Sequence, residues 1–249
     1  MKIIAITNQK GGTGKTTSTI NIGAGLTRLG NRVLLIDLDP QANLSFSLGL
    51  NDPANMPNIY MVLKGELALT SAVIEINNMG LIPASPQLVN LETEMAGDQN
   101  KAILLKKVLD DRLGFDYILL DCPPSYGLIT LNALTAAQEI FVPVQAEFLA
   151  LQGMSKLLET VQNVQREHNP TLEFSGIIAT RYDQRRVLNR EVIDSLLEHF
   201  RDKLFTTFIH ENIALAEAPS FGQDIFSYRP DSNGARDYLA LCQEIMERR

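Results

Sequence analysis

The chain has 249 residues, of which 45% are hydrophobic and 20% are charged, and its formal net charge is −7. This composition is typical of a globular protein with a substantial core, and the acidic balance excludes a whole-surface basic field that would attract nucleic acid. The two cysteines form no CxxC pair, the first residues do not resemble a signal peptide, and no apolar run approaches about 18 residues. We therefore expect a cytoplasmic protein.

Short hydrophobic runs alternate along the chain with longer segments of helical periodicity. The runs are almost continuously apolar, as in strands buried on both faces, and they predict strands at 2–7, 32–37, 116–121, 139–144, 174–180 and 204–209. Apolar residues at helical spacing predict helices at 15–29, 101–112, 150–167, 189–200 and 234–247. The alternation indicates the α/β class, with a doubly wound, mostly parallel sheet flanked by helices, whose strand ends share one edge.

A glycine-rich stretch, NQKGGTGKTT (8–17), follows the first predicted strand and leads into a predicted helix. This is the context of a phosphate-binding P-loop, in which backbone N–H groups at Gly11, Gly12 and Gly14 can wrap phosphate oxygens. The helix N-terminus adds its partial positive charge. The alternative is a glycine-rich turn with an incidental lysine, but the strand, loop and helix stand in the order that a P-loop requires.

The lysines of this loop are unusual. In a P-loop, Lys15 reaches the β- and γ-phosphates, and the Thr16 hydroxyl binds Mg²⁺. The common motif also has a glycine five residues before Gly14, where this chain has Gln9, and it has no counterpart of the second lysine, Lys10.

Carboxylates end two of the predicted strands. Asp37 and Asp39 follow the second strand, and Asp121 ends the hydrophobic run YILLD, as in a Walker B motif. We expect Asp121 to hold Mg²⁺ directly or through water, with Asp37 as a further candidate ligand, and Asp39 to orient or deprotonate the attacking water. An aspartate at a strand end can also serve only as a turn cap.

These motifs together resemble the ParA/MinD superfamily of P-loop ATPases, and within it the ParA/Soj branch. The resemblance runs from Lys2 to the final helix, and it rests on KGGTGKTT (10–17), which matches the deviant Walker A motif K-G-G-x-G-K-[ST], and on DLDPQAN (37–43), LLDCPPS (119–125), VPVQAEFLALQG (142–153) and NIALAEAPSFG (212–222). It implies that ATP and Mg²⁺ are the cofactors, that ATP binding closes a homodimer, and that intrinsic ATP hydrolysis is slow.

The family pattern also assigns roles to matching residues. Lys10 is implied to cross the dimer interface to the other subunit's phosphates, like an arginine finger supplied in trans; the alternative is a solvated loop lysine. Asp39 is implied to be needed for hydrolysis. The implied phosphate cradle consists of Gly11, Gly12, Thr13, Gly14, Lys15, Thr16 and Thr17, with Thr17 at the α-phosphate. Asn212 is implied to contact the base or ribose, and the lack of an N-K-x-D motif favours adenine over guanine.

Proteins of the ParA/Soj branch typically bind DNA without sequence preference as ATP-bound dimers. The strongest basic patch here is RYDQRRVLNR (181–190), in which four arginines against one aspartate leave a local charge of +3. Its arginines, Arg181, Arg185, Arg186 and Arg190, are the predicted DNA contacts; the alternative is a solvated charged loop. Many relatives also carry arginines where this chain has Glu211 and Ala214, so part of the usual basic surface is missing.

The resemblance predicts an ATPase switch that segregates or positions a chromosome, plasmid or other cargo, activated by a ParB-like partner and nucleoid-associated when ATP-bound. Because the first predicted strand begins at Lys2, we expect a single domain over 1–249 without an N-terminal helix-turn-helix extension. One alternative is a MinD-like membrane-positioning ATPase, but the apolar stripe of the last predicted helix is more typical of packing on the domain. A second alternative is a small-molecule ligase of the same superfamily, although DLDPQAN (37–43) looks more like a dimer switch than a substrate pocket. A third is a non-hydrolysing nucleotide-gated module, against which Asp39 and both lysines argue.

Overall fold

The computed structural model describes residues 1–147 and 150–248, so Phe148 and Leu149 of the VPVQAEFLALQG motif lie outside it. In the described residues, seven strands form one sheet in the order β3-β4-β2-β5-β1-β6-β7. Neighbouring strands are parallel except for the β3–β4 pair. The strands are β1 (Lys2–Ile6), β2 (Val33–Asp37), β3 (Ile74–Ile76), β4 (Met79–Ile82), β5 (Tyr117–Asp121), β6 (Glu139–Gln145) and β7 (Glu173–Thr180).

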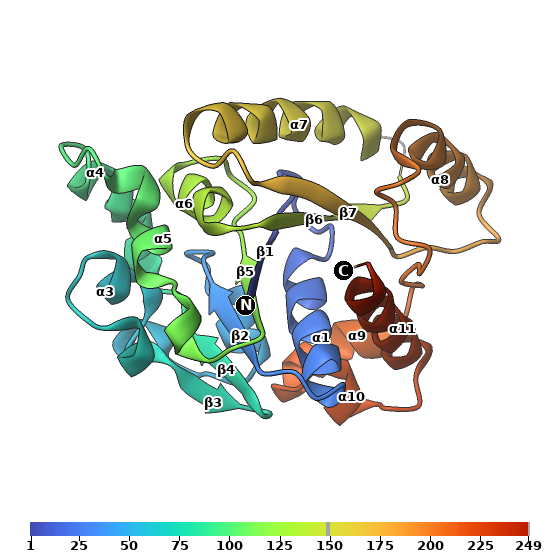
Figure 1. The fold of residues 1–249 in the computed structure, drawn as a ribbon. Coiled ribbons are helices and arrows are strands. Elements are labelled where there is room, and N and C mark those ends of the chain that lie inside the picture. The colour runs from blue at the N-terminus through green and yellow to red at the C-terminus, as the bar shows by residue number, and fades with distance from the viewer. Residues whose placement is uncertain (148–149, 249) are drawn as a thin grey trace.

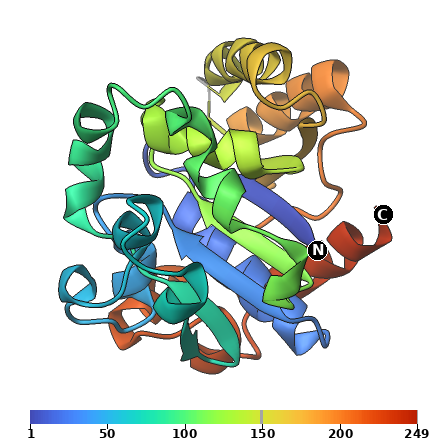
Figure 2. The same ribbon diagram turned by 60° about the vertical axis from the view of Figure 1, so that its left-hand side comes forward.

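Helices cover both faces of the sheet, which confirms the predicted fold class (Figure 1). They are α1 (Lys15–Arg28), α2 (Asn43–Ser47), α3 (Ile59–Leu63), α4 (Leu91–Glu94), α5 (Leu104–Val108), α6 (Leu128–Ala136), α7 (Ala150–Glu167), α8 (Val187–Phe200), α9 (Ile213–Glu217), α10 (Ile225–Tyr228) and α11 (Asn233–Glu247). One hydrophobic core lies under α6, α7 and α8, and a second lies under α1 and α11. Figure 2 shows α7 and α8 side by side, as Figure 1 does.

Five of the six predicted strands are present, but 204–209 is not a strand. This segment forms one isolated bridge to β7, between Leu204 and Ile177, and its Phe205 and Ile209 N–H groups donate to the carbonyls of Ile177 and Ala179. The backbone N–H groups of Thr206 and Thr207 instead donate to the carboxylate of Glu244 on α11, at 2.8 and 3.0 Å. Of these two groups, the Thr207 N–H is the one that a continued strand would have offered to β7, so the ladder is interrupted between Phe205 and Ile209.

Several short elements escaped prediction. The β3–β4 hairpin turns at Asn77 and Asn78, both of which have positive φ, the backbone that two-residue hairpin loops need. Helix α6 also went unnoticed, because its residues are mostly buried and so show little helical periodicity. The helix predicted at 101–112 is broken into 3₁₀ turns on either side of α5.

The last helix packs on the domain as predicted. The side chains of its apolar stripe, which are Tyr238, Leu241, Cys242 and Ile245, are all buried. Against them lies α1, where a Cβ on Gly25 would approach the Cys242 Sγ to 2.6 Å and the Phe226 ring to 3.3 Å. The stripe is therefore part of the core and is not a free lipid-binding face.

We expect Gly25→Ala to lower the free energy of unfolding by about 1–3 kcal/mol, because the added methyl group overpacks the contact between α1 and α11. Gly153→Ala is the matched control, since nothing lies within 4 Å of a Cβ at that position in α7. Its better helix propensity should raise the free energy of unfolding by up to about 1 kcal/mol. Urea denaturation of the two variants measures both; a stabilised Gly25→Ala protein would contradict the packing described.

Candidate nucleotide site

The carboxyl ends of β1, β2 and β5 meet at one edge of the sheet. In the strand register Asp37 lies opposite Asp121, and Asp121 lies opposite Ile6, the last residue of β1. The glycine-rich loop leaves β1 at this point and enters α1 at Lys15. The loop and both carboxylate-bearing strand ends, which are far apart in the sequence, are thus brought together.

Carbonyl groups of the glycine-rich loop are held by side chains from neighbouring strand ends. Gly12 and Gly14 have φ of 75° and 88°, and no side chain of the described residues caps α1 at Gly14. Two of the loop carbonyl oxygens accept hydrogen bonds from side chains. Gln145 Nε2 donates to Gly12 O at 2.6 Å, and Thr180 Oγ1 donates to Thr13 O at 2.9 Å. The uncapped N–H groups and the helix dipole make this a favourable place for an anion.

Gln145 and Thr180 were missed by reasoning from the sequence. They end β6 and β7, so they belong to the same edge of the sheet as the aspartates. Their position in the sequence could have identified them. Each is a polar residue at the carboxyl end of a buried parallel strand, and ligands of such sheets bind at that edge.

Lys15 folds back over the loop. Its side chain is buried, and Nζ donates to the backbone carbonyl of Lys10 at 3.2 Å. Burial lowers the pKa of Lys15, while the nearby carboxylates of Asp121 and Asp39 act in the opposite direction. A buried ammonium group at the mouth of the loop is well placed to pair with an incoming phosphate.

Thr16 and Asp121 supply the oxygen ligands that Mg²⁺ prefers. Thr16 Oγ1 donates to Asp121 Oδ2 at 2.8 Å, and Thr19 Oγ1 donates to Asp121 Oδ1 at 3.1 Å. Burial, followed by the nearby Asp37, raises the pKa of Asp121 to about 8. A buried carboxylate whose charge is so unfavourable fits a place that a cation would occupy. No cage of three acidic, histidine or cysteine ligands forms within the described ranges.

Asp37 and Asp39 differ in what they face. The Asp37 carboxylate is fully buried and accepts hydrogen bonds from Ser45 N, Ser45 Oγ and Asp39 N at 2.9, 2.7 and 3.1 Å. Burial raises its pKa to about 7. Asp39 lines the pocket in front of the loop, and its Oδ1 accepts from Gln41 N at 3.0 Å. Asp37 thus holds the chain that presents Asp39; its candidate role as a metal ligand stays a prediction.

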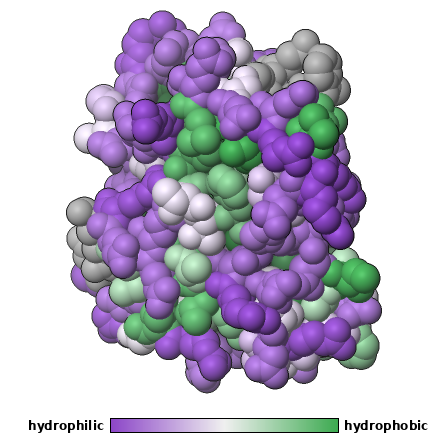
Figure 3. Space-filling model, turned by 90° about the vertical axis from the view of Figure 1, so that its right-hand side faces the viewer, coloured by the Kyte–Doolittle hydropathy of each residue, from purple (hydrophilic) through white to green (hydrophobic). Residues whose placement is uncertain are grey.

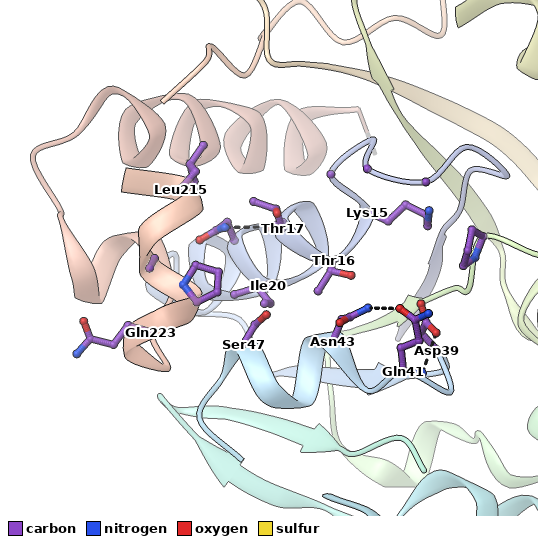
Figure 4. A pocket seen from close by; sticks show the side chains of 17 residues that line it. Lys15, Thr16, Thr17, Ile20, Asp39, Gln41, Asn43, Ser47, Leu215 and Gln223 are labelled. Atoms are coloured by element: carbon purple, nitrogen blue, oxygen red, sulfur yellow. Dashed lines mark hydrogen bonds between the residues drawn. The ribbon is translucent and has the colours of Figure 1, made fainter. Parts of the chain in front are cut away.

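A pocket of about 360 Å³ lies in front of the loop, and Figure 4 shows Lys15, Thr16 and Asp39 on its wall. An adjoining pocket of about 430 Å³ contains Asn212, whose Oδ1 accepts from Ala214 N and caps α9. The two pockets share four wall residues, which are Gly12, Gly14, Thr17 and Leu215. Their sizes are those of small-molecule sites, and the shared wall would let one elongated ligand occupy both.

Lys10 lines neither pocket in this chain. Its Nζ pairs with Glu147 Oε2 at 2.7 Å, and this hydrogen bond lowers the pKa of Glu147. The lysine side chain is 38% exposed and the glutamate 52% exposed. The position suits a contact outside its own subunit, although the trans role itself stays a prediction.

The predicted DNA contacts, called here the arginine cluster (Arg181, Arg185, Arg186 and Arg190), lie together beside the second pocket, but with more acidic neighbours than the sequence suggested. Arg185 pairs with Asp183 at 2.9 Å, and Glu211 pairs with both Arg181 and Arg186. The local charge of +3 counted along the sequence is therefore +2 once Glu211 is included. Figure 3 shows a mostly hydrophilic face on this side of the molecule, with apolar residues in separate patches.

Comparison with known proteins agrees with this geometry. The family model described as an AAA domain matches residues 1–174. The sporulation initiation inhibitor protein Soj of Bacillus subtilis is 43% identical over 98% of both chains, and the chromosome-partitioning ATPase Soj of Thermus thermophilus is 46% identical over 98% of this chain and 95% of its own. Among solved structures, cobyrinic acid a,c-diamide synthase from Mycobacterium smegmatis with bound ATP analog and magnesium has a TM-score of 0.88 at 36% identity, covering 99% of this chain and 94% of that chain.

The buried carboxyls predict a pH dependence of stability in the nucleotide-free protein. The pKa of Asp37 is about 7 and that of Asp121 about 8 in the fold, against about 4 in an unfolded chain. Between pH ~4 and ~8 the native state therefore binds more protons than the unfolded state, so the free energy of unfolding falls as pH rises across this range, and the contribution is fully lost above about pH 8.

Asp37→Asn removes one of these titrations, so the free energy of unfolding should fall less steeply between pH 5 and 8 than in the unsubstituted protein. Urea denaturation across that range measures the slope. An unchanged slope in Asp37→Asn would show that the buried carboxyl does not hold a proton.

Proposed function

Because this chain belongs to the ParA/Soj family of P-loop ATPases, we propose that it is an ATP-hydrolysing switch whose ATP-bound homodimer binds DNA without sequence preference. Its output is the segregation or positioning of a chromosome, plasmid or other cargo. The observation that carries the proposal is the pocket lined by the loop glycines, Lys15, Thr16 and Asp39, with the buried Asp121 carboxylate hydrogen-bonded to Thr16.

ATP fits the two adjoining pockets with its phosphates at the loop and its base beside Asn212. The backbone of 11–14 and the α1 N-terminus would hold the phosphates, with Lys15 at the β- and γ-phosphates. The hydroxyl of Thr16 and the carboxylate of Asp121, 2.8 Å apart, would hold Mg²⁺. The chemistry that the bound metal supplies is neutralisation of charge on the phosphate oxygens.

Hydrolysis requires a positioned water and compensation of charge on the departing γ-phosphoryl group. Asp39 is the carboxylate that we assign to the water, because it lines the pocket while Asp37 supports the loop that carries it. Lys10 of the other subunit would supply the additional positive charge. Its pairing with Glu147 does not oppose this, since a half-exposed ion pair contributes only about 0–1 kcal/mol.

DNA binding would use the arginine cluster, doubled by dimerisation so that contacts from both subunits act together. Such binding neutralises phosphates and should weaken steeply with salt. We place the protein in the cytoplasm, on the nucleoid when ATP is bound. A ParB-like partner would accelerate hydrolysis and release the dimer from DNA.

A small-molecule ligase is the second candidate, because the solved structure with a TM-score of 0.88 is named as a diamide synthase. ATP consumption that depends on a metabolite and ignores DNA would favour it. A MinD-like membrane role finds no support in the last helix, whose apolar stripe is buried. Among the described helices none is long and apolar enough to cross a membrane.

We expect Lys15→Ala to abolish ATP binding and Asp39→Ala to leave an ATP-loaded dimer that persists, because the first change removes a phosphate contact and the second only the group that activates water. Light scattering after size-exclusion chromatography measures the dimer, with and without saturating ATP. A monomeric Asp39→Ala protein at saturating ATP would show that the role assigned to Asp39 is wrong.

We expect the double variant Arg185→Glu with Arg186→Glu to lose at least about tenfold in affinity for DNA at 0.1 M salt, because two phosphate contacts become repulsive. ATP binding should be unchanged, since neither residue lines either pocket. The control is Arg112→Glu with Arg166→Glu, which makes the same charge change at arginines 90% and 70% exposed elsewhere. Equal DNA affinities for the two double variants would show that the DNA-binding surface lies outside the arginine cluster.

A further inference from the structure

One carboxylate holds two members of the arginine cluster. Arg181 Nη2 lies 3.2 Å from Glu211 Oε1, and Arg186 Nη2 lies 2.8 Å from Glu211 Oε2. Each carboxylate oxygen therefore accepts from a different arginine. The side chains of all three residues are 40–60% exposed, so the arrangement lies on the surface and is open to other ligands.

The backbone keeps Glu211 in this position. Tyr182 N donates to Ile209 O at 3.0 Å, and Glu211 N donates to Tyr182 O at 3.2 Å, so the segments after β7 and before α9 run side by side. Arg181 has a φ of 51°, in the left-handed region that non-glycine residues rarely adopt. The Tyr182 ring packs against Phe208 at 4.9 Å. The local backbone fold thus brings Glu211 close to Arg181 and Arg186.

We propose that Glu211 is a charge mask on the DNA-binding surface of this protein. Its carboxylate occupies the guanidinium donors of Arg181 and Arg186 that a DNA phosphate would otherwise use, because carboxylate and phosphate oxygens compete for the same geometry. The DNA affinity is consequently lower than the arginine cluster alone would give. The inference rests on the proposed function, in which this cluster contacts DNA.

The strength of the mask follows from exposure and charge. An exposed ion pair is weak, so DNA can displace Glu211, but the carboxylate stays nearby and repels phosphate. Removing its charge raises the local charge from +2 to +3 in each protomer. Each additional phosphate contact steepens the dependence of log K on log salt by about 0.9.

The test is Glu211→Gln, which keeps the shape of the side chain and removes its charge. Glu211 also lines the second pocket, so the ATP affinity of the variant is measured first with a fluorescent analogue. DNA binding is then measured at saturating ATP over roughly 0.05–0.3 M KCl, where counterion release dominates the salt dependence. We expect DNA binding at least about threefold tighter at 0.1 M salt, with a slope steeper by about 1 per protomer. The control is Glu198→Gln, the same charge change at an exposed position of α8.

A further variant separates masking from a general charge effect. Glu211→Gln is therefore also introduced into an Arg181→Gln, Arg186→Gln background, where it should give no gain in affinity over that background, because the donors it would release are already gone. A gain that persists, or a Glu211→Gln protein that matches Glu198→Gln in affinity and slope, would overturn the mask while ATP-dependent DNA binding by the unsubstituted protein stands. If neither the unsubstituted protein nor Glu211→Gln binds DNA with ATP, the mask and the DNA role fail together.

Discussion

The hydrogen bonds behind the glycine-rich loop are the constraint on which the site depends. A loop of this kind binds an anion only if its N–H groups face the pocket, so its carbonyls need other partners. Gln145 and Thr180 supply them from the ends of β6 and β7. The order of the sheet, with β6 beside β1 and β7 beside β6, therefore shapes the loop as much as its glycines do.

The same edge of the sheet holds buried ionisable groups whose charged forms are unfavourable in the protein alone. Burial raises the pKa values of Asp37 and Asp121 and lowers that of Lys15, so each of these groups is held in an environment that disfavours its charged form. A nucleotide and its metal bring the opposite charges: phosphates for the lysine and a cation for the carboxylates. Buried groups with perturbed pKa values in a pocket are a recognised mark of functional sites.

Local sequence was enough to predict five strands of the sheet, the loop and the edge shared by Asp37, Asp39 and Asp121, because parallel topology alone places those strand ends together. It was not enough where distant side chains decide. Gln145 and Thr180 act on residues 133 and 167 positions away, and Glu244 of α11 binds the N–H groups of Thr206 and Thr207 within the predicted strand 204–209. Likewise, Glu211 joins the arginine cluster across 25 to 30 residues. The assigned roles in binding and hydrolysis stay predictions.

The packing of α11 against α1 also affects the reactivity of the cysteine thiols. Cys242 is enclosed between these helices, and Cys122, the other cysteine of the chain, is buried next to Asp121. Burial raises the pKa of both thiols, so the reactive thiolate is scarce at neutral pH. Maleimide should therefore leave both cysteines of the folded protein unmodified, and a cysteine introduced on its surface would accept a fluorophore selectively.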